Sequence, residues 1–331
     1  MKILGIGNAL VDVLIKLPDE NLLHELNVKK GSMNLIDAET RKIIFEKIKD
    51  FPIAQTTGGS VSNTTLALKN LGGQVGFMGK AGNDKYGDFY LREMTDLDIE
   101  MHLIQENALS GTAITLITPD GERTFCTYLG AAADMRKEDL QSSVFENYTH
   151  LYIEGYLVQN HELIESALAM AKSLQMTTIF DLASFNVVAS DREFIQSLVD
   201  RYVDILFANE EEAMELTGKS PELAINEIAE KVSLVIMKGG AKGSWVKQKD
   251  LFVHVPVYKK IKPVDTTAAG DYYTAGFFYG MINWGNPEKC AKLGTLLAYH
   301  VIQVIGTKLP EETWIKIRKK AKAILNNNYE L

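Results

Sequence analysis

The sequence predicts an α/β protein in which helices cover a central, mostly parallel sheet and a small β-sheet stands apart. Short apolar segments of strand character recur along the chain, and between several of them the apolar residues are spaced three and four positions apart, as in helices. Strands that alternate with helices pair in parallel, with the helices packed on the sheet. No repeat or Pro/Gly-rich linker interrupts the 331 residues, so we expect a single domain over residues 1–331.

The strand character lies in six segments: residues 2–9 (KILGIGNA), 74–82 (QVGFMGKAG), 150–155 (HLYIEG), 177–183 (TTIFDLA), 204–209 (DILFAN) and 233–240 (SLVIMKGG). Helical spacing is found over residues 63–72, 161–175 and 192–202. The opening run MKILGIGNALVDVLIKL (residues 1–17) superficially resembles a signal peptide, but Asp12 interrupts the apolar residues and no cleavage pattern follows. We therefore interpret the run as a buried first strand. Ligands of such sheets bind beyond the carboxyl ends of the strands, so we expect the functional site there.

Two stretches interrupt this rhythm and are richer in β-branched alternation, approximately residues 12–36 and 99–130. Within the second, TPDGERT (residues 118–124) predicts a hairpin, because Asp-Gly adopts the backbone angles that a tight turn needs. We expect the two stretches to form a discontinuous β-lid that flanks the cleft of the larger α/β part.

Composition excludes several classes of protein. The net charge of −8 argues against nucleic-acid binding, which needs clustered lysine and arginine, and the basic stretch IKIRKKAKAIL suits the solvated face of a helix. A membrane span needs about 18 uninterrupted apolar residues, and no such run is present. Cys126 and Cys290 form no C-x-x-C and the histidines form no H-E-x-x-H, so we expect no zinc site, and a reducing cytoplasm fits.

Two familiar nucleotide motifs match only in part. The segment GQVGFMGKAG has Gln74 where a P-loop needs its first glycine and Ala81 where Ser or Thr should follow the lysine. The segment GIGNAL has two of the three dinucleotide-fold glycines, and no acidic residue is placed convincingly after a second strand. A nicotinamide dehydrogenase is therefore a weak alternative.

The segment VDTTAAGDYYTAGFF (residues 264–278) carries the strongest chemical signal. Unpaired N–H groups at a helix N-terminus attract anions, and small residues such as Ala268, Ala269 and Gly270 let a phosphate approach the backbone. Asp271 would then lie in the first helical turn, beside any anion bound there. Helix capping by a preceding threonine, with Asp271 as partner of the helix dipole, explains the same residues, so the segment alone leaves both interpretations open.

The residues DTTAAGD resemble the C-terminal signature of the ribokinase-like, or PfkB, carbohydrate and nucleoside kinases, Asp-Thr-Thr-Gly-Ala-Gly-Asp, at six of seven positions. The resemblance implies a ribokinase-like three-layer α/β/α sandwich and a phosphotransferase with an alcohol acceptor. It implies that Asp271 is the general base and that the backbone of Ala268, Ala269 and Gly270 forms an anion hole for the phosphoryl group. Ala268 replaces the usual glycine, and its Cβ narrows the pocket and forbids some backbone angles.

Further segments resemble the family in the same order along the chain. The residues GGSVSN resemble its N-terminal signature and imply substrate contacts from Gly58, Gly59 and Asn63. The residues FANEEEAMELTG match the family's Asn-x-x-Glu element. This match implies that Asn209 and Glu212 hold a magnesium–phosphate network through water.

The strand and turn MKGGAKGSW resemble the family's nucleotide-binding segment. They imply contacts with ATP from three residues: Lys238, which stands where a threonine is common, Gly240 and Gly243. The family often binds K⁺ or another monovalent cation near the anion hole. The resemblance implies that such a cation would involve Asp265, Thr267 and the segment around Gly306.

Asn8 and Asp12 at the end of the first strand suit paired ribose hydroxyls, because a carboxylate accepts from two hydroxyls and an amide can bridge. Their Asn-x-x-x-Asp spacing is more similar to the adenosine-kinase branch of the family than to ribokinases. The segment RTFCTYLGAAADM resembles the lid of that branch and implies that Arg123 reaches over the phosphates.

The resemblance thus implies an adenosine-kinase-like enzyme that uses ATP and Mg²⁺ to phosphorylate a primary hydroxyl of a nucleoside or sugar. It implies a monomer or a homodimer. A ribokinase- or fructokinase-type sugar kinase and a non-catalytic nucleoside or sugar sensor are the alternatives.

Overall fold

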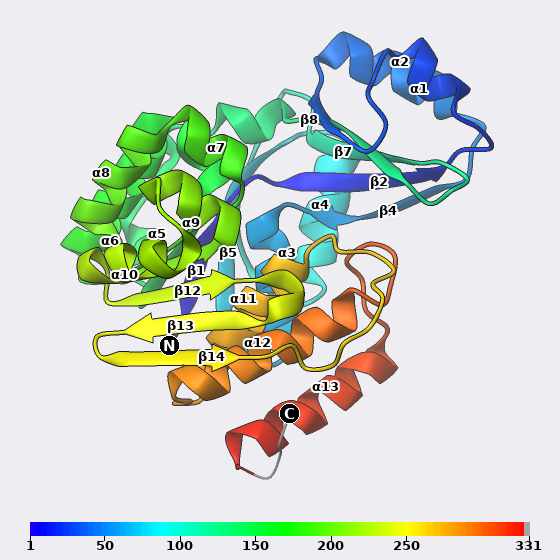
Figure 1. Ribbon diagram of the computed structural model, residues 1–331. Coiled ribbons are helices and arrows are strands. Elements are labelled where there is room, and N and C mark those ends of the chain that lie inside the picture. Colours follow the sequence, from blue (N-terminus) through cyan, green and yellow to red (C-terminus); the bar gives the residue numbers. More distant parts are fainter. Residues whose placement is uncertain (328–331) are drawn as a thin grey trace.

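The computed structural model describes residues 1–327, which form a large α/β body with a smaller sheet at one side (Figure 1). Residues 328–331, which the predicted domain includes, lie outside the described residues. The larger sheet is mostly parallel and has helices on both faces, as the sequence predicts. Within residues 1–327, no helix has both the length and the apolar character needed to cross a membrane.

The large sheet has the strand order β14-β13-β12-β11-β10-β9-β1-β5-β6. Its strands pair in parallel from β12 to β6, and β13 and β14 add an antiparallel edge. All six strand segments expected from the sequence are confirmed in this sheet. The bounds are β1 Ile3–Ile6, β5 Val75–Gly82, β6 Glu100–Glu106, β9 His150–Glu154, β10 Thr177–Asp181, β11 Ile205–Asn209, β12 Leu234–Lys238, β13 Ser244–Gln248 and β14 Leu251–Val255.

Strand β1 is the switch point of the sheet, because β5 and β9 pair on its opposite sides. In open α/β sheets such a reversal opens a crevice at the carboxyl ends of the strands, and ligands bind there. Helix α3 (Ser60–Asn70) packs directly on β1, since a Cβ added to Gly5 would lie 2.5 Å from Cγ1 of Val61. This close approach places the start of α3 at the switch point.

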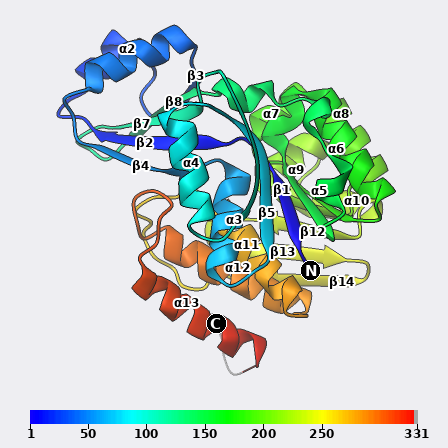
Figure 2. The same cartoon turned by 180° about the vertical axis from the view of Figure 1, so that it is seen from behind.

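Successive residues of the strands point to opposite faces of the sheet. Phe207 packs in the core on one face, whereas its neighbours Leu206 and Ala208 pack in the core on the other. Figures 1 and 2 show the two groups of helices on opposite sides of the sheet. The first group is α3, α4 (Lys85–Thr95), α11 (Ala269–Ile282), α12 (Pro287–Val301) and α13 (Glu311–Leu325). The second group is α5 (Ser142–Phe145), α6 (His161–Ser173), α7 (Phe185–Ser190), α8 (Arg192–Tyr202), α9 (Glu210–Thr217) and α10 (Pro221–Lys231).

The smaller sheet has the order β3-β8-β7-β2-β4. Its strands are β2 Leu10–Lys16, β3 Met33–Leu35, β4 Ile53–Gly58, β7 Gly111–Ile117 and β8 Arg123–Tyr128, and helices α1 (Asn21–Glu25) and α2 (Ala38–Ile48) lie beside them (Figure 1). The hairpin expected at TPDGERT joins the antiparallel strands β7 and β8, and Gly121 in its turn has a φ of 87°.

The structure differs from the sequence expectations in two places. The opening run is not one strand, because Gly7 to Ala9 leave the large sheet and the chain continues as β2 of the small sheet. The second stretch of the expected lid began at residue 99, whereas β6 pairs in parallel with β5 in the large sheet. The small sheet also contains β4, which lies outside both expected stretches. As an edge strand, β6 is only half-buried, so its sequence resembles that of a strand with one solvated face.

Candidate active site

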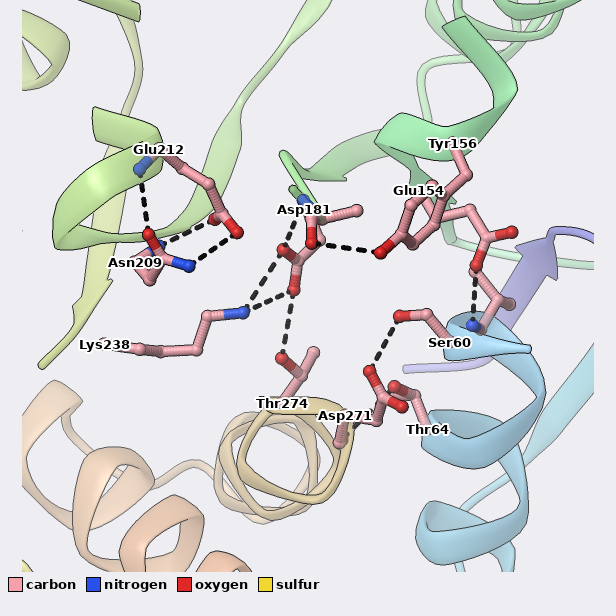
Figure 3. A network of polar contacts seen from close by, with 12 residues as sticks. Ser60, Thr64, Glu154, Tyr156, Asp181, Asn209, Glu212, Lys238, Asp271 and Thr274 are labelled. Carbon is pink, nitrogen blue, oxygen red and sulfur yellow. Dashed lines mark hydrogen bonds and ion pairs between the residues drawn. The ribbon is translucent and has the colours of Figure 1, made fainter. Parts of the chain in front are cut away.

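Polar side chains gather where neighbouring parallel strands of the large sheet end (Figure 3). Asn8 follows β1, and the last residues of the next four strands are Glu154, Asp181, Asn209 and Lys238. The first turns of α3 and α11 face this edge, and β2 brings Asp12 to it from the small sheet. The site is therefore assembled at the switch point, as the fold class predicts.

Asp271 lies in the first turn of α11, and α3 holds its carboxylate from both sides. Oγ of Ser60 donates to Oδ1 of Asp271 at 2.7 Å, and Nδ2 of Asn63 donates to Oδ2 at 2.8 Å. Oγ1 of Thr64 donates to the Asp271 carbonyl at 3.2 Å. Asn63 was expected to meet the substrate sugar, and here its amide orients Asp271.

Burial raises the pKa of Asp271 to about 6, while the hydrogen bonds from Asn63 and Ser60 and the charge of Lys238 oppose the rise. A carboxylate with this pKa is ionised at neutral pH and is still a stronger base than an ordinary aspartate. The environment of Asp271 therefore suits proton abstraction from an alcohol.

The N-terminus of α11 offers backbone N–H groups beside this carboxylate. Among residues 1–327, the amides of Ala268, Gly270 and Asp271 have no hydrogen-bond acceptor, whereas the Ala269 amide donates to the Thr266 carbonyl at 3.1 Å. The expected anion hole thus has available amides on either side of Ala269. Ala268 has a left-handed φ of 59°, the region that glycine adopts without strain.

Asp12 and the Gly58–Gly59 segment lie against each other. A Cβ on Gly58 would be 2.1 Å from Oδ1 of Asp12, and one on Gly59 would be 2.3 Å from the carbonyl oxygen of Asn8. The carboxylate of Asp12 forms no hydrogen bond within the described part of the chain, and burial, together with the nearby carboxylates of Asp271 and Asp265, raises its pKa to about 7. Its oxygens are therefore available to an incoming donor.

Glu154 was not predicted from the sequence, and its carboxylate joins Asn8 after β1 to Val61 in α3. Its Oε1 accepts from the backbone amide and Nδ2 of Asn8 at 2.9 and 3.1 Å, and its Oε2 accepts from the Val61 amide at 3.0 Å. Burial raises the pKa of Glu154 to about 7 against these donors. An acidic residue that ends a buried apolar strand was the available signal, and Asp181 carries the same one.

A second group of charged residues lies at the ends of β10, β11 and β12. Nζ of Lys238 donates to Oδ2 and Oδ1 of Asp181 at 2.8 and 3.2 Å. Glu212 and Asn209 form a capping box, in which the Glu212 carboxylate accepts from the Asn209 amide and from its Nδ2 at 2.8 and 2.7 Å. Burial raises the pKa of Glu212 to about 7, although Lys238 opposes this.

Arg123 does not extend freely over the site, because its guanidinium forms an ion pair with Asp265 and donates to Oγ1 of Thr267 at 3.2 Å. The Asp265 carboxylate also accepts from the amides of Thr267 and Gly306 at 2.9 and 2.7 Å. Donors therefore occupy Asp265 where a monovalent cation was expected, and Arg123 would have to move before Asp265 could bind one.

The glycines expected near the nucleotide shape the turn between β12 and β13. Gly240 and Gly243 have φ angles of 55° and 94°, and a Cβ on Gly243 would lie 2.2 Å from the Val255 carbonyl oxygen. The turn therefore requires Gly243, and contact of these glycines with ATP stays a prediction.

A cavity of about 500 Å³ opens beside Asn8. Its lining mixes apolar side chains such as Leu129, Ala132 and Met135 with polar and charged ones, among them Asn8, Tyr156, Gln159, His161 and Glu162. Its volume is usual for a small-molecule site.

Comparison with known proteins identifies the family of the chain. The model of the pfkB family carbohydrate kinases matches residues 25–314. The chain belongs to the PfkB family. PfkB kinases transfer a phosphoryl group to a hydroxyl, which confirms the expected enzyme class. A solved structure of a related kinase superimposes on this chain, which confirms the expected ribokinase-like fold.

Relatives of this PfkB kinase act on different acceptors, to judge by their names. The chain is 28% identical over 260 residues to 5-dehydro-2-deoxygluconokinase of Bacillus subtilis, with 74% of this chain and 80% of the relative covered. It is 26% identical to adenosine kinase 2 of Arabidopsis thaliana, with 94% and 96% covered. The crystal structure of adenosine kinase from Sinorhizobium meliloti superimposes with a TM-score of 0.86 at 30% identity, over 97% of this chain and 99% of that one.

Proposed function

We propose that this PfkB kinase transfers the γ-phosphoryl group of ATP to a primary hydroxyl of a nucleoside, with Asp271 as general base. The observation that carries the proposal is the Asp271 carboxylate, held by Ser60 and Asn63 beside available amides at the start of α11. A base next to an anion hole is the arrangement that phosphoryl transfer to an alcohol needs.

The proposed step moves one proton and one phosphoryl group. Asp271 takes the proton of the hydroxyl, and the oxygen forms a bond to the γ-phosphorus as the bond from that phosphorus to the β–γ bridging oxygen breaks. The products are the phosphorylated acceptor and ADP. The amides of Gly270 and Asp271 donate to the phosphoryl oxygens, where negative charge is concentrated.

The oxygens at the ends of β10 and β11 suit Mg²⁺ held indirectly. No group of three or more His, Cys, Asp or Glu side chains in residues 1–327 could enclose a metal ion. Mg²⁺ usually keeps several waters and binds through one or two carboxylates and substrate phosphates. Glu212 and Asn209 would hold such waters, and the ion would offset the charge of the phosphates.

The cavity beside Asn8 favours a nucleoside over a free sugar. The carboxylate of Asp12 would accept hydrogen bonds from the ribose hydroxyls, and the side-chain amide of Asn8 would donate to or accept from them. The adjoining cavity, whose lining includes Tyr156 and Met135, would take the nucleobase. A free pentose or hexose would leave this cavity unfilled. The alternative is a sugar kinase, because one relative is a 5-dehydro-2-deoxygluconokinase.

The test is ADP formation with a panel of acceptors, namely adenosine, inosine, ribose and fructose, under matched ATP and Mg²⁺. Transfer to a nucleoside at a kcat/KM well above that for either sugar is the expected result. Tyr156→Ala should raise the KM for the nucleoside and leave that for ribose unchanged. Preference for a free sugar would replace the nucleoside proposal, and no transfer to any acceptor would favour a sensor. Cytoplasmic location and a monomeric or dimeric state stay predictions.

A further inference from the structure

Lys238 places an ammonium group beside the start of α11. Its side chain is 17% exposed and its partner Asp181 is 3% exposed, so the pair is largely removed from solvent. A Cβ added to Gly270 would lie 3.4 Å from Nζ of Lys238. The ammonium thus lies next to the turn in which the amides of Ala268, Gly270 and Asp271 have no acceptor in the described residues (Figure 3).

Lys238 lies near more than one carboxylate. Asp181, Glu212 and Asp271 all act on the ammonium, and together they raise its pKa against the effect of burial. Lys238 is therefore protonated at neutral pH. Burying a lysine and an aspartate together for stability alone brings little, because desolvation offsets their attraction.

The position of the pair suggests chemistry instead. Asp181 accepts from Nζ with both oxygens, and Oγ1 of Thr274 on α11 lies 3.5 Å from Asp181 Oδ2. An ammonium carries three N–H donors, so the two bonds to Asp181 leave one donor for another acceptor. On the side of Gly270, which lacks a Cβ, that acceptor can be a phosphoryl oxygen.

We infer that Lys238 is a catalytic residue, whose ammonium contacts the transferring phosphoryl group at the N-terminus of α11 and stabilises it in the transition state. Asp181 is the positioning residue that holds the ammonium there. The inference rests on the proposed kinase function and adds to it a role in transfer, distinct from binding of the nucleotide. A fixed positive charge near the phosphoryl oxygens lowers the barrier without reorganisation at the moment of reaction.

The first test is the turnover of Lys238→Met with the preferred acceptor. Loss of one preorganised donor should lower kcat by roughly 10²- to 10³-fold, with the KM for acceptor changed less than about threefold. Lys172→Met is the matched control, since Lys172 pairs with Asp204 at 2.5 Å at the opposite end of the sheet, and its kcat should match the wild type. The double variant Lys238→Met/Asp181→Asn removes both charges, and it should fold like the wild type and remain as slow as the single variant.

The second test compares the affinity for ADP with that for ADP plus aluminium fluoride, which mimics the phosphoryl group in transfer, in the presence of the acceptor. Lys238→Met should bind ADP like the wild type and lose at least about tenfold of the gain that aluminium fluoride gives, since each tenfold is 1.4 kcal/mol. Equal loss in both measurements would make Lys238 a nucleotide-binding residue only, and unchanged kcat would remove it from catalysis. Either result overturns the inference while the wild type still transfers phosphate. A wild type that phosphorylates no acceptor would overturn the proposed function as well.

Discussion

Nδ2 of Asn63 donates a 2.8 Å hydrogen bond to Oδ2 of Asp271, across 208 residues of sequence. This contact joins the first turn of α3 to the first turn of α11. It orients the carboxylate, and with it the lone pair that would receive the proton. Asp271 and the Gly58–Gly59 segment, which precedes α3 and lies against Asp12, are therefore parts of one site.

Asp271→Asn should reduce kcat by roughly 10²- to 10⁴-fold, because an amide cannot accept the hydroxyl proton. The asparagine keeps the shape of the side chain and an oxygen for one of its two partners, so thermal unfolding should change little. Turnover of the purified variant, with its melting temperature measured alongside, checks both statements. Near-normal turnover would contradict the role of Asp271.

Activity should fall with acid, because the proposed base Asp271 must be ionised to take a proton, and Asp12 loses its charge and part of its acceptor capacity when it is protonated. Burial raises their pKa values to about 6 and about 7, so the base form of each is lost as the pH falls through these values. With saturating acceptor we expect kcat to decline below about pH 6, and kcat/KM to decline from about pH 7. A rate profile that stays flat down to about pH 5 would exclude this assignment.

Asp12→Ala should weaken capture of the acceptor. A hydrogen bond to a charged group contributes about 1.5–3 kcal/mol, which corresponds to a KM increased roughly 10- to 150-fold. Asp19→Ala is a suitable control, since Asp19 is exposed and bonds only to Asn21 in the described residues. An unchanged KM for every acceptor of the panel would remove Asp12 from the site.

Ala268 should tolerate glycine and resist a β-branched residue. In the left-handed region an alanine costs about 1 kcal/mol, and replacing it by glycine relieves this but adds about 0.4–1 kcal/mol of unfolded-state entropy. Ala268→Gly should therefore melt within a few degrees of the wild type and retain turnover. Ala268→Val should lower both melting temperature and kcat, and a valine variant as stable as the wild type would show that the backbone here is not constrained.

The sequence by itself determined the parallel strands, several of the helices and the DTTAAGD segment with Asp271. These features are local, because the spacing of apolar residues specifies a strand or a helix and a helix start carries its own unpaired amides. It also placed Asn8 at the end of the first strand, where fold topology gathers ligands, whereas Asp12, which was expected there too, lies within β2 of the small sheet.

Only the tertiary structure decided how these parts meet. The opening run divides between two sheets because Gly7 to Ala9 leave β1 beside α3, and β4 and β6 join their sheets through partners distant in sequence. The bonds of Glu154 to Asn8 and Val61 and the pair of Asp181 with Lys238 join strand ends to residues 57 to 146 positions away. Periodicity in one segment carries no record of such partners, because burial and charge at these positions arise only when the strands pack side by side.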